Sequence, residues 1–361
     1  MLRKPWMYQL ALLLVCQFSH AAEPPKITDA RLEVRSAAAG LEDTIRRILE
    51  EQTGTVWIGY AAPVIAGQHE MCCYGSEGFE RSSRCCGDCQ LEEGRPRAAI
   101  GQQAVACQAN LESGDEFHIL LRAAGGRVTK VRPYSADCAL DADGLAVAWL
   151  SDVRPAESVA YLSALARASR FTNDDVARQA IDVLALHADA SAEEALTQML
   201  APGNAESLRA HAAFWLAGAH GKVGLQTVLA AFHSEKDAEF RKQAVFAISQ
   251  SKEPDALPKL IQIARGDHDP EARSEALFWL AQAAGRKVAG VISDAIENDP
   301  ETEVKKKAVF SLSEMPDNEG VPLLISVARG NKNPVLRKEA IFWLGQSDDP
   351  RALDYIAAIL R

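Results

Sequence analysis

A pattern of apolar positions recurs every 32 residues along the C-terminal part of the chain, and the same alanine marks each repeat. Counted from that alanine, apolar residues stand four positions before, one after and four after, as do Leu336, Ile341 and Leu344 around Ala340. This spacing places them on one face of an amphipathic helix, with the alanine inside that face. We expect a second helix to approach closely there because the alanine side chain is small. The six alanines are Ala180, Ala212, Ala244, Ala276, Ala308 and Ala340.

A second apolar pair follows 13 and 16 residues after the alanine in most repeats, as at Leu225 and Val228. It predicts a second helix after a short turn. One helix pair cannot cover its own apolar face, so the pairs must stack on one another into a solenoid. Asp269 and Pro270 supply the N-cap and the first-turn proline that are typical of a helix start.

The sequence DPEARSEALFWL at residues 269–280 resembles the short HEAT-like repeat of the phycobilisome-lyase type, and the resemblance covers residues 170–361. It implies an α-solenoid. HEAT-like proteins mostly bind other proteins, and a few of this type attach bilins to phycobiliproteins. We therefore expect a mainly α fold in which residues 151–361 form about six HEAT-like repeats, with a capping helix at 155–168 before the first.

Two positions depart from the usual pattern of that repeat. Two residues after the alanine, where a polar residue is usual, stand Phe214, Phe246, Phe278, Phe310 and Phe342. One residue further on, Trp215, Trp279 and Trp343 alternate with Ala247 and Ser311. The phenylalanine position lies on the opposite side of the helix from the apolar face. The phenylalanines therefore either pack between stacked repeats or form an exposed ladder that binds a partner. For the tryptophans, large and small residues in alternation favour packing.

A basic residue also recurs, three positions before the alanine, and it belongs to the first turn of the predicted helix. The members are Arg209, Arg241, Arg273, Lys305 and Arg337. In that place we expect each one to bond neighbouring loops or acids across the stack, which is a structural role.

Residues 22–150 predict a small α+β domain that precedes the repeats. Leu41 to Gln52 reads as an amphipathic helix, and the β-branched and aromatic run from Thr55 to Tyr60 reads as a strand. Two further strand-like runs, 116–122 and 127–134, flank Gly125-Gly126 and predict a β-hairpin. We expect this domain to share part of its core with the first repeat.

The first 21 residues have the pattern of a secretory signal peptide. Arg3 and Lys4 precede an apolar run from Leu10 to Val15, and small residues follow at the expected cleavage site after Ala21. We therefore expect a periplasmic or secreted protein. Removing residues 1–21 takes away two basic residues and leaves a net charge of −12, which argues against nucleic acid as a partner. No second apolar run is long enough for a transmembrane segment in the mature chain.

The cysteines of the mature chain all lie before the repeats, which is typical of a disulfide framework in an exported protein. They are Cys72, Cys73, Cys85, Cys86, Cys89, Cys107 and Cys138. Seven is odd, so one thiol is free or pairs between chains, and the sequence does not fix the connectivity. Two alternatives stay open: a zinc site formed by His69, Cys72, Cys85, Cys86 and Cys89, and a redox dithiol at Cys86 and Cys89.

The sequence contains no catalytic motif: G-x-S-x-G, H-E-x-x-H and a phosphate-binding glycine loop are all absent. The unusual positions recur in each repeat, whereas a catalytic group is needed once. We therefore predict an interaction scaffold that binds a protein partner of unknown identity through the solenoid, without a cofactor. The alternatives are a metal-binding or redox module in the Cys-rich domain, or an enzyme of the bilin-lyase type.

Overall fold

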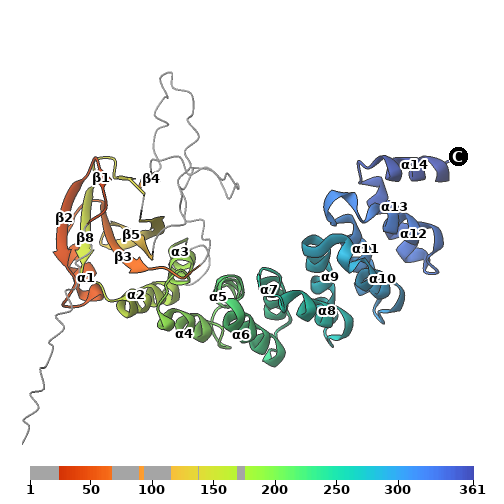
Figure 1. Ribbon diagram of the computed structural model, residues 1–361, viewed down its shortest axis with the longest axis horizontal. Coiled ribbons are helices and arrows are strands. Elements are labelled where there is room, and N and C mark those ends of the chain that lie inside the picture. The colour runs from red at the N-terminus through yellow and green to blue at the C-terminus, as the bar shows by residue number, and fades with distance from the viewer. Residues whose placement is uncertain (1–23, 67–88, 93–114, 137, 169–174) are drawn as a thin grey trace, which may run out of the picture.

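The molecule is elongated, with a β-sheet region at one end and a curved stack of helices extending from it (Figure 1). This computed structural model describes residues 24–66, 89–92, 115–136, 138–168 and 175–361. The helical stack confirms the expected solenoid. In the part of the chain that the structure describes, no helix is long and apolar enough to cross a membrane.

The main sheet has five strands, and only three of them were expected from the sequence. Their order is β2 (Arg31–Ser36), β8 (Ala146–Ser151), β3 (Val56–Pro63), β5 (Glu116–Ala124) and β6 (Arg127–Ser135). β5 and β6 form the predicted hairpin, and Gly125 and Gly126 turn it with φ of 59° and 71°. β8 pairs in parallel with both β2 and β3, and helix α1 (Leu41–Glu51) connects β2 to β3. The sequence did not predict β2 and β8.

A second, smaller sheet covers part of one face of the main sheet. It consists of β1 (Ile27–Thr28), β7 (Leu140–Asp141) and β4 (Cys89–Gln90). Between the two sheets lies a separate apolar cluster that includes Trp57, Leu91, Leu120 and Tyr134, all with at most 1% of their surface exposed. The opposite face of the main sheet packs on α1 and on the first helices of the solenoid.

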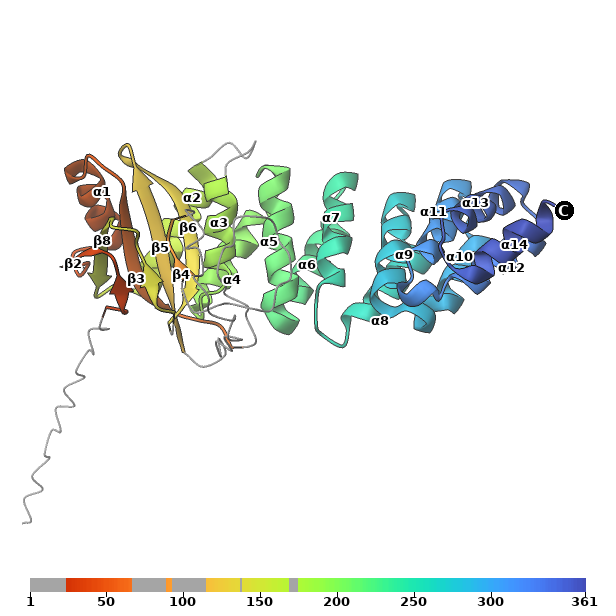
Figure 2. The same ribbon diagram turned by 90° about the horizontal axis from the view of Figure 1, so that it is seen from above.

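The solenoid begins with α2 (Pro155–Ala168), at the bounds that the sequence predicts for the capping helix, and continues as six helix pairs. The first helices of the pairs are α3 (Asp175–Leu184), α5 (Glu206–Ala219), α7 (Ala238–Ser249), α9 (Pro270–Ala284), α11 (Thr302–Ser313) and α13 (Pro334–Gly345). The second helices are α4 (Ala190–Met199), α6 (Gly221–Ser234), α8 (Ala256–Gly266), α10 (Ala289–Asn298), α12 (Val321–Gly330) and α14 (Pro350–Ile359). Short 3-10 turns, η1 (Gly285–Val288) and η2 (Pro316–Asn318), precede α10 and α12. Figure 2 shows the first helices lying side by side along the stack.

The repeating alanines lie at the points of closest packing, as predicted. All six have no exposed surface. The helix starts are also as expected, because the side chain of Asp269 accepts a hydrogen bond from the backbone N–H of Glu271, and Asn333 does the same for Val335. These caps satisfy backbone donors that have no partner within the helix.

The sheet and the solenoid share one hydrophobic core, which runs from Ala37 in the sheet region to Tyr355 in α14. Polar contacts also join them. Gln179 on α3 accepts a hydrogen bond from the backbone N–H of Val131 (2.8 Å), and Pro63 at the end of β3 accepts one from Ala188 (3.0 Å). The first repeat therefore covers the β6 edge of the sheet, which would otherwise expose unpaired backbone groups.

Candidate partner-binding surface

The phenylalanine position faces the inner side of the curved solenoid. Figure 1 shows the first helices α5, α7, α9, α11 and α13 along that side and the second helices along the outer side. The buried alanine of each first helix faces the second helices, and a residue two positions on points away from them. Four of the five phenylalanines are half-buried, and Phe342 is 53% exposed. They are thus neither core residues nor free side chains.

The phenylalanines and tryptophans contact one another in one continuous line. Phe214 stacks on Phe246 with ring centroids 5.8 Å apart and 18° between the planes, and Phe278 stacks on Phe310 at 5.8 Å and 6°. We call this line the aromatic ladder; it comprises Phe214, Trp215, Phe246, Phe278, Trp279, Phe310, Phe342 and Trp343.

The tryptophans join the stacked pairs. The Trp279 ring centroid lies 4.7 Å from that of Phe246 and 4.9 Å from that of Phe278. The Trp343 ring lies between those of Phe310 and Phe342, with centroid distances of 4.7 and 4.9 Å. This geometry explains why tryptophan appears in every second repeat. A stacked phenylalanine pair spans one boundary between repeats, and a tryptophan spans the next.

Carboxylates hold the tryptophan rings in place. The Trp279 indole N–H donates to Glu275 (2.6 Å), one turn earlier on α9, and Trp343 donates to Glu339 (2.9 Å) on α13. These hydrogen bonds to charged acceptors fix the ring orientation and leave the indole without an unpaired donor. The ladder is therefore a surface whose aromatic side chains are already ordered.

The first repeat carries an aspartate where the later repeats carry phenylalanine, and the ladder ends there. Asp182 accepts a hydrogen bond from the Trp215 indole (2.8 Å), and its Oδ1 lies 2.6 Å from Nε2 of His211. His211 in turn stacks near Phe214, with centroids 6.3 Å apart. The sequence did not predict a role for Asp182 or His211, although the replacement of phenylalanine by aspartate at position 182 indicates that the first repeat differs.

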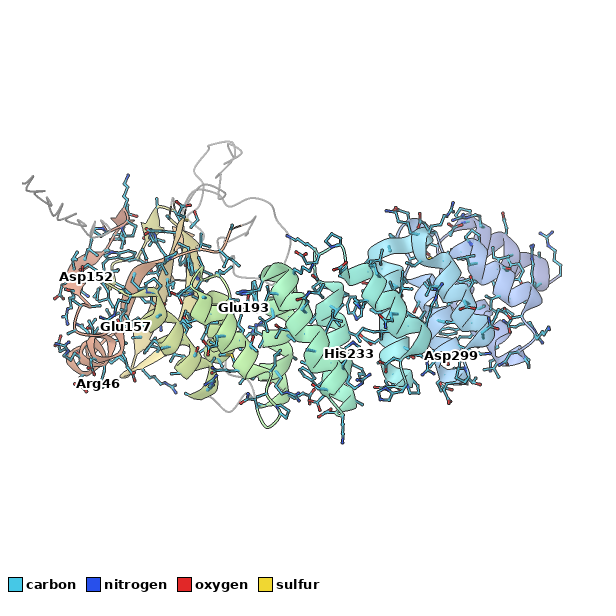
Figure 3. All side chains as sticks on the ribbon, turned by 60° about the horizontal axis from the view of Figure 1, so that its bottom comes forward. Arg46, Asp152, Glu157, Glu193, His233 and Asp299 are labelled. Atoms are coloured by element: carbon cyan, nitrogen blue, oxygen red, sulfur yellow. The ribbon has the colours of Figure 1, made fainter. Side chains whose placement is uncertain are left out.

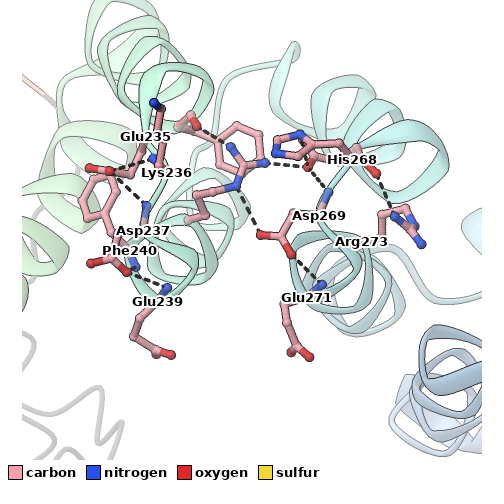
Figure 4. Close-up of polar contacts among 12 residues, drawn as sticks. Glu235, Lys236, Asp237, Glu239, Phe240, His268, Asp269, Glu271 and Arg273 are labelled. Atoms are coloured by element: carbon pink, nitrogen blue, oxygen red, sulfur yellow. Dashed lines mark hydrogen bonds and ion pairs between the residues drawn. The ribbon is translucent and has the colours of Figure 1, made fainter. Parts of the chain in front are cut away.

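The basic column is structural, as predicted. Arg241 is 2% exposed, donates to the carbonyl of Phe232 (2.7 Å), to Asp267 (2.5 Å) and to Asp269 (3.3 Å), and places its guanidinium 4.1 Å from the Phe232 ring. Figure 4 shows these polar contacts between consecutive repeats. Arg241 thereby ties the last turn of α6 to the loop that follows α8.

Other members of the column repeat this arrangement. Arg273 binds both carboxylate oxygens of Asp299 (2.8 and 2.9 Å), a residue labelled in Figure 3. Arg209 bonds Glu235 and lies over the Phe240 ring. The backbone N–H of Asp237 and, secondarily, Arg209 lower the pKa of Glu235 to about 2, so this carboxylate stays ionised.

Comparison with known proteins assigns the solenoid. A family model of HEAT repeats matches residues 193–281 and 291–361. Residues 193–361 are HEAT repeats. The family resemblance that the sequence indicated is thereby confirmed for the part of the chain that carries the ladder. A search of curated protein sequences gives no match.

Solved structures of other proteins are similar over about half of the chain. One is human deoxyhypusine hydroxylase in complex with glycerol, at 16% identity, covering 56% of this chain and 78% of that one, with a TM-score of 0.30. Another is YibA of Escherichia coli, at 20% identity, covering 50% of this chain and 67% of that one, with a TM-score of 0.35. A third is the complex of CpcE and CpcF of phycocyanin lyase from Nostoc, at 19% identity, covering 54% of this chain and 77% of that one, with a TM-score of 0.29. None of these similarities says what this chain binds.

The residues of the cysteine cluster fall mostly outside the described part of the chain. These are His69, Cys72, Cys73, Cys85, Cys86 and Cys107, and of Cys89 only the backbone is described. Cys138, just before β7, is disulfide-bonded in the structure. Within the described residues no three side chains gather as metal ligands. The zinc site and the redox dithiol therefore stay predictions.

Two further places in the described structure have the residue types of an active site but not its geometry. Ser158 and His187 are hydrogen-bonded (2.8 Å), yet both are buried, and no substrate could reach them. A cavity of about 240 Å³ between α8 and α10 is lined by three aspartates and two arginines among small and apolar residues. Two of the aspartates, Asp267 and Asp299, are already bound by arginines of the basic column.

Proposed function

We propose that this chain is an exported scaffold that binds a protein partner through the aromatic ladder on the inner side of its HEAT repeats. The observation that supports this most directly is the continuity of the ladder across five repeats with its rings only half-buried. Tyrosine, tryptophan and other aromatic residues are enriched at the centres of protein interfaces. Rings already fixed by stacking and by Glu275 and Glu339 lose little conformational freedom on binding.

Export accounts for the cysteines of the N-terminal region. The signal-peptide pattern in residues 1–21 and the disulfide at Cys138 favour an oxidising compartment, where a disulfide framework is stable. The proposal assigns no chemistry to the chain, and no described site favours the lyase alternative.

The ladder is tested by removing two rings that stack on each other. The variant Phe278→Ser/Phe310→Ser and the wild type are purified with their partners from the extracytoplasmic fraction after cross-linking, and the recovered proteins are quantified by mass spectrometry. We expect at least about a tenfold loss of the partner in the variant, the usual effect of removing a hot-spot residue. The control is Val223→Ser, which removes a 55% exposed apolar side chain from α6 on the outer side. Full recovery of the same partner by the ladder variant would refute the proposal.

The free energy of unfolding tests whether the ladder is a surface feature or part of the core. Phe278→Ser alone should lower the free energy of unfolding by about 1–2 kcal/mol, because it loses one stacked pair and a half-buried ring. Leu280→Ala on the same helix removes a fully buried side chain and should cost about 2–5 kcal/mol. Urea unfolding measures both. An equal loss for the two would show that the ladder is core.

Export is tested separately in the same cells. Leu13→Arg places a charge in the apolar run and should keep the protein inside, with its thiols reduced. Thiol labelling after cell fractionation reads both effects. Unchanged location and oxidation would refute export and leave the ladder hypothesis standing.

A further inference from the structure

The second helix of the sixth repeat exposes positions that α6 buries and that α8, α10 and α12 bury or half-bury. At 13, 17 and 20 residues after the repeating alanine, α6 carries Leu225, Leu229 and Phe232, with 1%, 9% and 0% of their surface exposed. The same positions of α14 are Leu353, Ala357 and Leu360, and all three are exposed, Leu353 to 57% and Leu360 to 80%.

These α14 residues form one apolar stripe. They are spaced i, i+4 and i+7, so they lie on one face of the helix, and Leu360 keeps helical backbone angles after the last full turn. That face differs from the one that packs into the solenoid, which carries the buried Ala352 and Tyr355. The stripe on α14 has the apolar character that the same positions have in α6, but it is exposed.

The inner repeats show what such a stripe does. Phe232 at the end of α6 contacts the next repeat, because Arg241 of α7 binds its carbonyl and lies 4.1 Å from its ring. A stripe of this kind is thus a contact face for another helix.

The charges beside the stripe indicate which helix fits. Asp354 lies on one edge of the stripe, and Arg361 directly follows the C-cap Leu360, whose backbone angles are still helical, so a helical continuation places Arg361 along the same edge. If two α14 helices cross antiparallel about Ala357, Leu353 of each meets Leu360 of the other, and Asp354 of each faces Arg361 of the other. Antiparallel helices bring equal edges together, so both ion pairs form at once. The small Ala357 at the crossing point allows close approach.

We propose that this face binds a second copy of the chain, with the two α14 helices antiparallel about a two-fold axis at Ala357. The interface is isologous, so it closes as a dimer and does not propagate into a filament. It lies at the opposite end of the molecule from the sheet region (Figure 1) and away from the part of the aromatic ladder on α5 to α11.

The first test is the mass of the purified full chain in solution. Sedimentation velocity over a concentration series should show the wild type changing from one to two chains, and Leu353→Glu should remain a monomer throughout. The matched control Val223→Glu places the same charge at a similarly exposed apolar residue of α6 and should still dimerise. A monomeric wild type at every concentration, or a dimer that tolerates Leu353→Glu, would overturn the proposal.

Charge reversal identifies the partner as the same helix. Asp354→Arg and Arg361→Asp should each weaken self-association at least about tenfold, because each places like charges opposite one another twice. A mixture of the two variants should associate as a heterodimer, because one chain then carries arginine and the other aspartate at both positions, so two ion pairs form, one in the original sense and one reversed. The double variant Asp354→Arg/Arg361→Asp should dimerise like the wild type. Failure of the mixture to associate would show that α14 does not pair with itself in this way.

Discussion

The sheet region and the solenoid bury their cores in different ways. In the sheet region the contacts join distant parts of the chain: β2 pairs with β8, and Ser36 donates a hydrogen bond to Asp152, 116 residues away. In the solenoid the contacts join neighbouring repeats, as Arg273 and Asp299 do across 26 residues. One region is held by contacts that each occur once, and the other by one contact set that recurs.

This difference decides how each region responds to change. A repeated contact in the solenoid has equivalents in other repeats, so its effect can be compared along one column of the sequence. A contact in the sheet region has no equivalent and depends on the exact fit of a few side chains. Three measurements test that contrast.

The largest effect is expected at Arg241, in the interior of the basic column. Arg241→Ala leaves the largely buried Asp267 carboxylate without its cationic partner and the Phe232 carbonyl without this donor, which should cost about 3–5 kcal/mol of the free energy of unfolding. Arg337→Ala at the same position of the sixth repeat is the control. Arg337 is half-buried and bonds only backbone carbonyls, so its loss should cost about 1 kcal/mol. Equal losses in urea unfolding would contradict the assigned difference.

A somewhat smaller effect is expected from pH at the junction of the two regions. The Nδ1 of His187 lies 3.1 Å from the Val183 carbonyl, which can only accept, so Nδ1 carries the proton and Nε2 accepts from Ser158. The Ser158 hydroxyl in turn accepts a hydrogen bond from the hydroxyl of Tyr60 on β3 (2.9 Å). The chain of hydrogen bonds from sheet to solenoid therefore requires neutral His187.

Burial lowers the pKa of His187 to about 4, whereas an exposed histidine titrates near 6.5. Between these values the unfolded chain binds a proton that the folded chain does not, so stability falls as the pH falls from about 6.5 to about 4, by about 3 kcal/mol in all. Urea unfolding at about pH 7 and about pH 4.5 should show this loss in the wild type and a smaller one in His187→Gln. The same pH dependence in both proteins would exclude His187 as its source.

The smallest of the three effects is expected at Gly59 in β3. A Cβ there would lie 2.7 Å from Leu120 and 2.8 Å from the Trp149 ring, so Gly59→Ala should cost about 1–3 kcal/mol through overpacking. Gly54→Ala in the preceding turn meets no atom within 4 Å and should be nearly neutral. Thermal unfolding compares the two. If Gly59→Ala left the stability unchanged, the sheet would tolerate an added methyl group at this position as well as the surface turn does at Gly54.

The sequence predicted those elements whose signal is local. The hairpin around Gly125-Gly126, helix α1 and the capping helix α2 all carry their own periodicity or turn residues, and all three form where expected. β2 was not predicted because it is largely exposed, so burial does not mark it with an alternating apolar pattern. β8 was not predicted because it is a short apolar run that has no alternation of its own. They become strands by pairing with each other across more than a hundred residues.

The candidate site was predicted in part. The five phenylalanines were identified by their position in the repeat, and the sequence left open whether they pack or project. The structure shows that they do both, because each ring contacts a neighbouring aromatic ring and remains half-buried or exposed. Asp182 and His211, which end the ladder, were not identified. Their roles depend on which side chains of the next helix they meet, and a single helix does not determine that.

The sequence by itself determined the period, the helix pairs and the face on which each residue lies, because helical geometry relates these to neighbours a few positions away. Tertiary structure decided the interleaving of Trp279 between Phe246 and Phe278, the joining of the sheet to the first repeat, and the exposure of the stripe on α14. These depend on the rotation and offset between stacked helices, which arise only when the complete core packs.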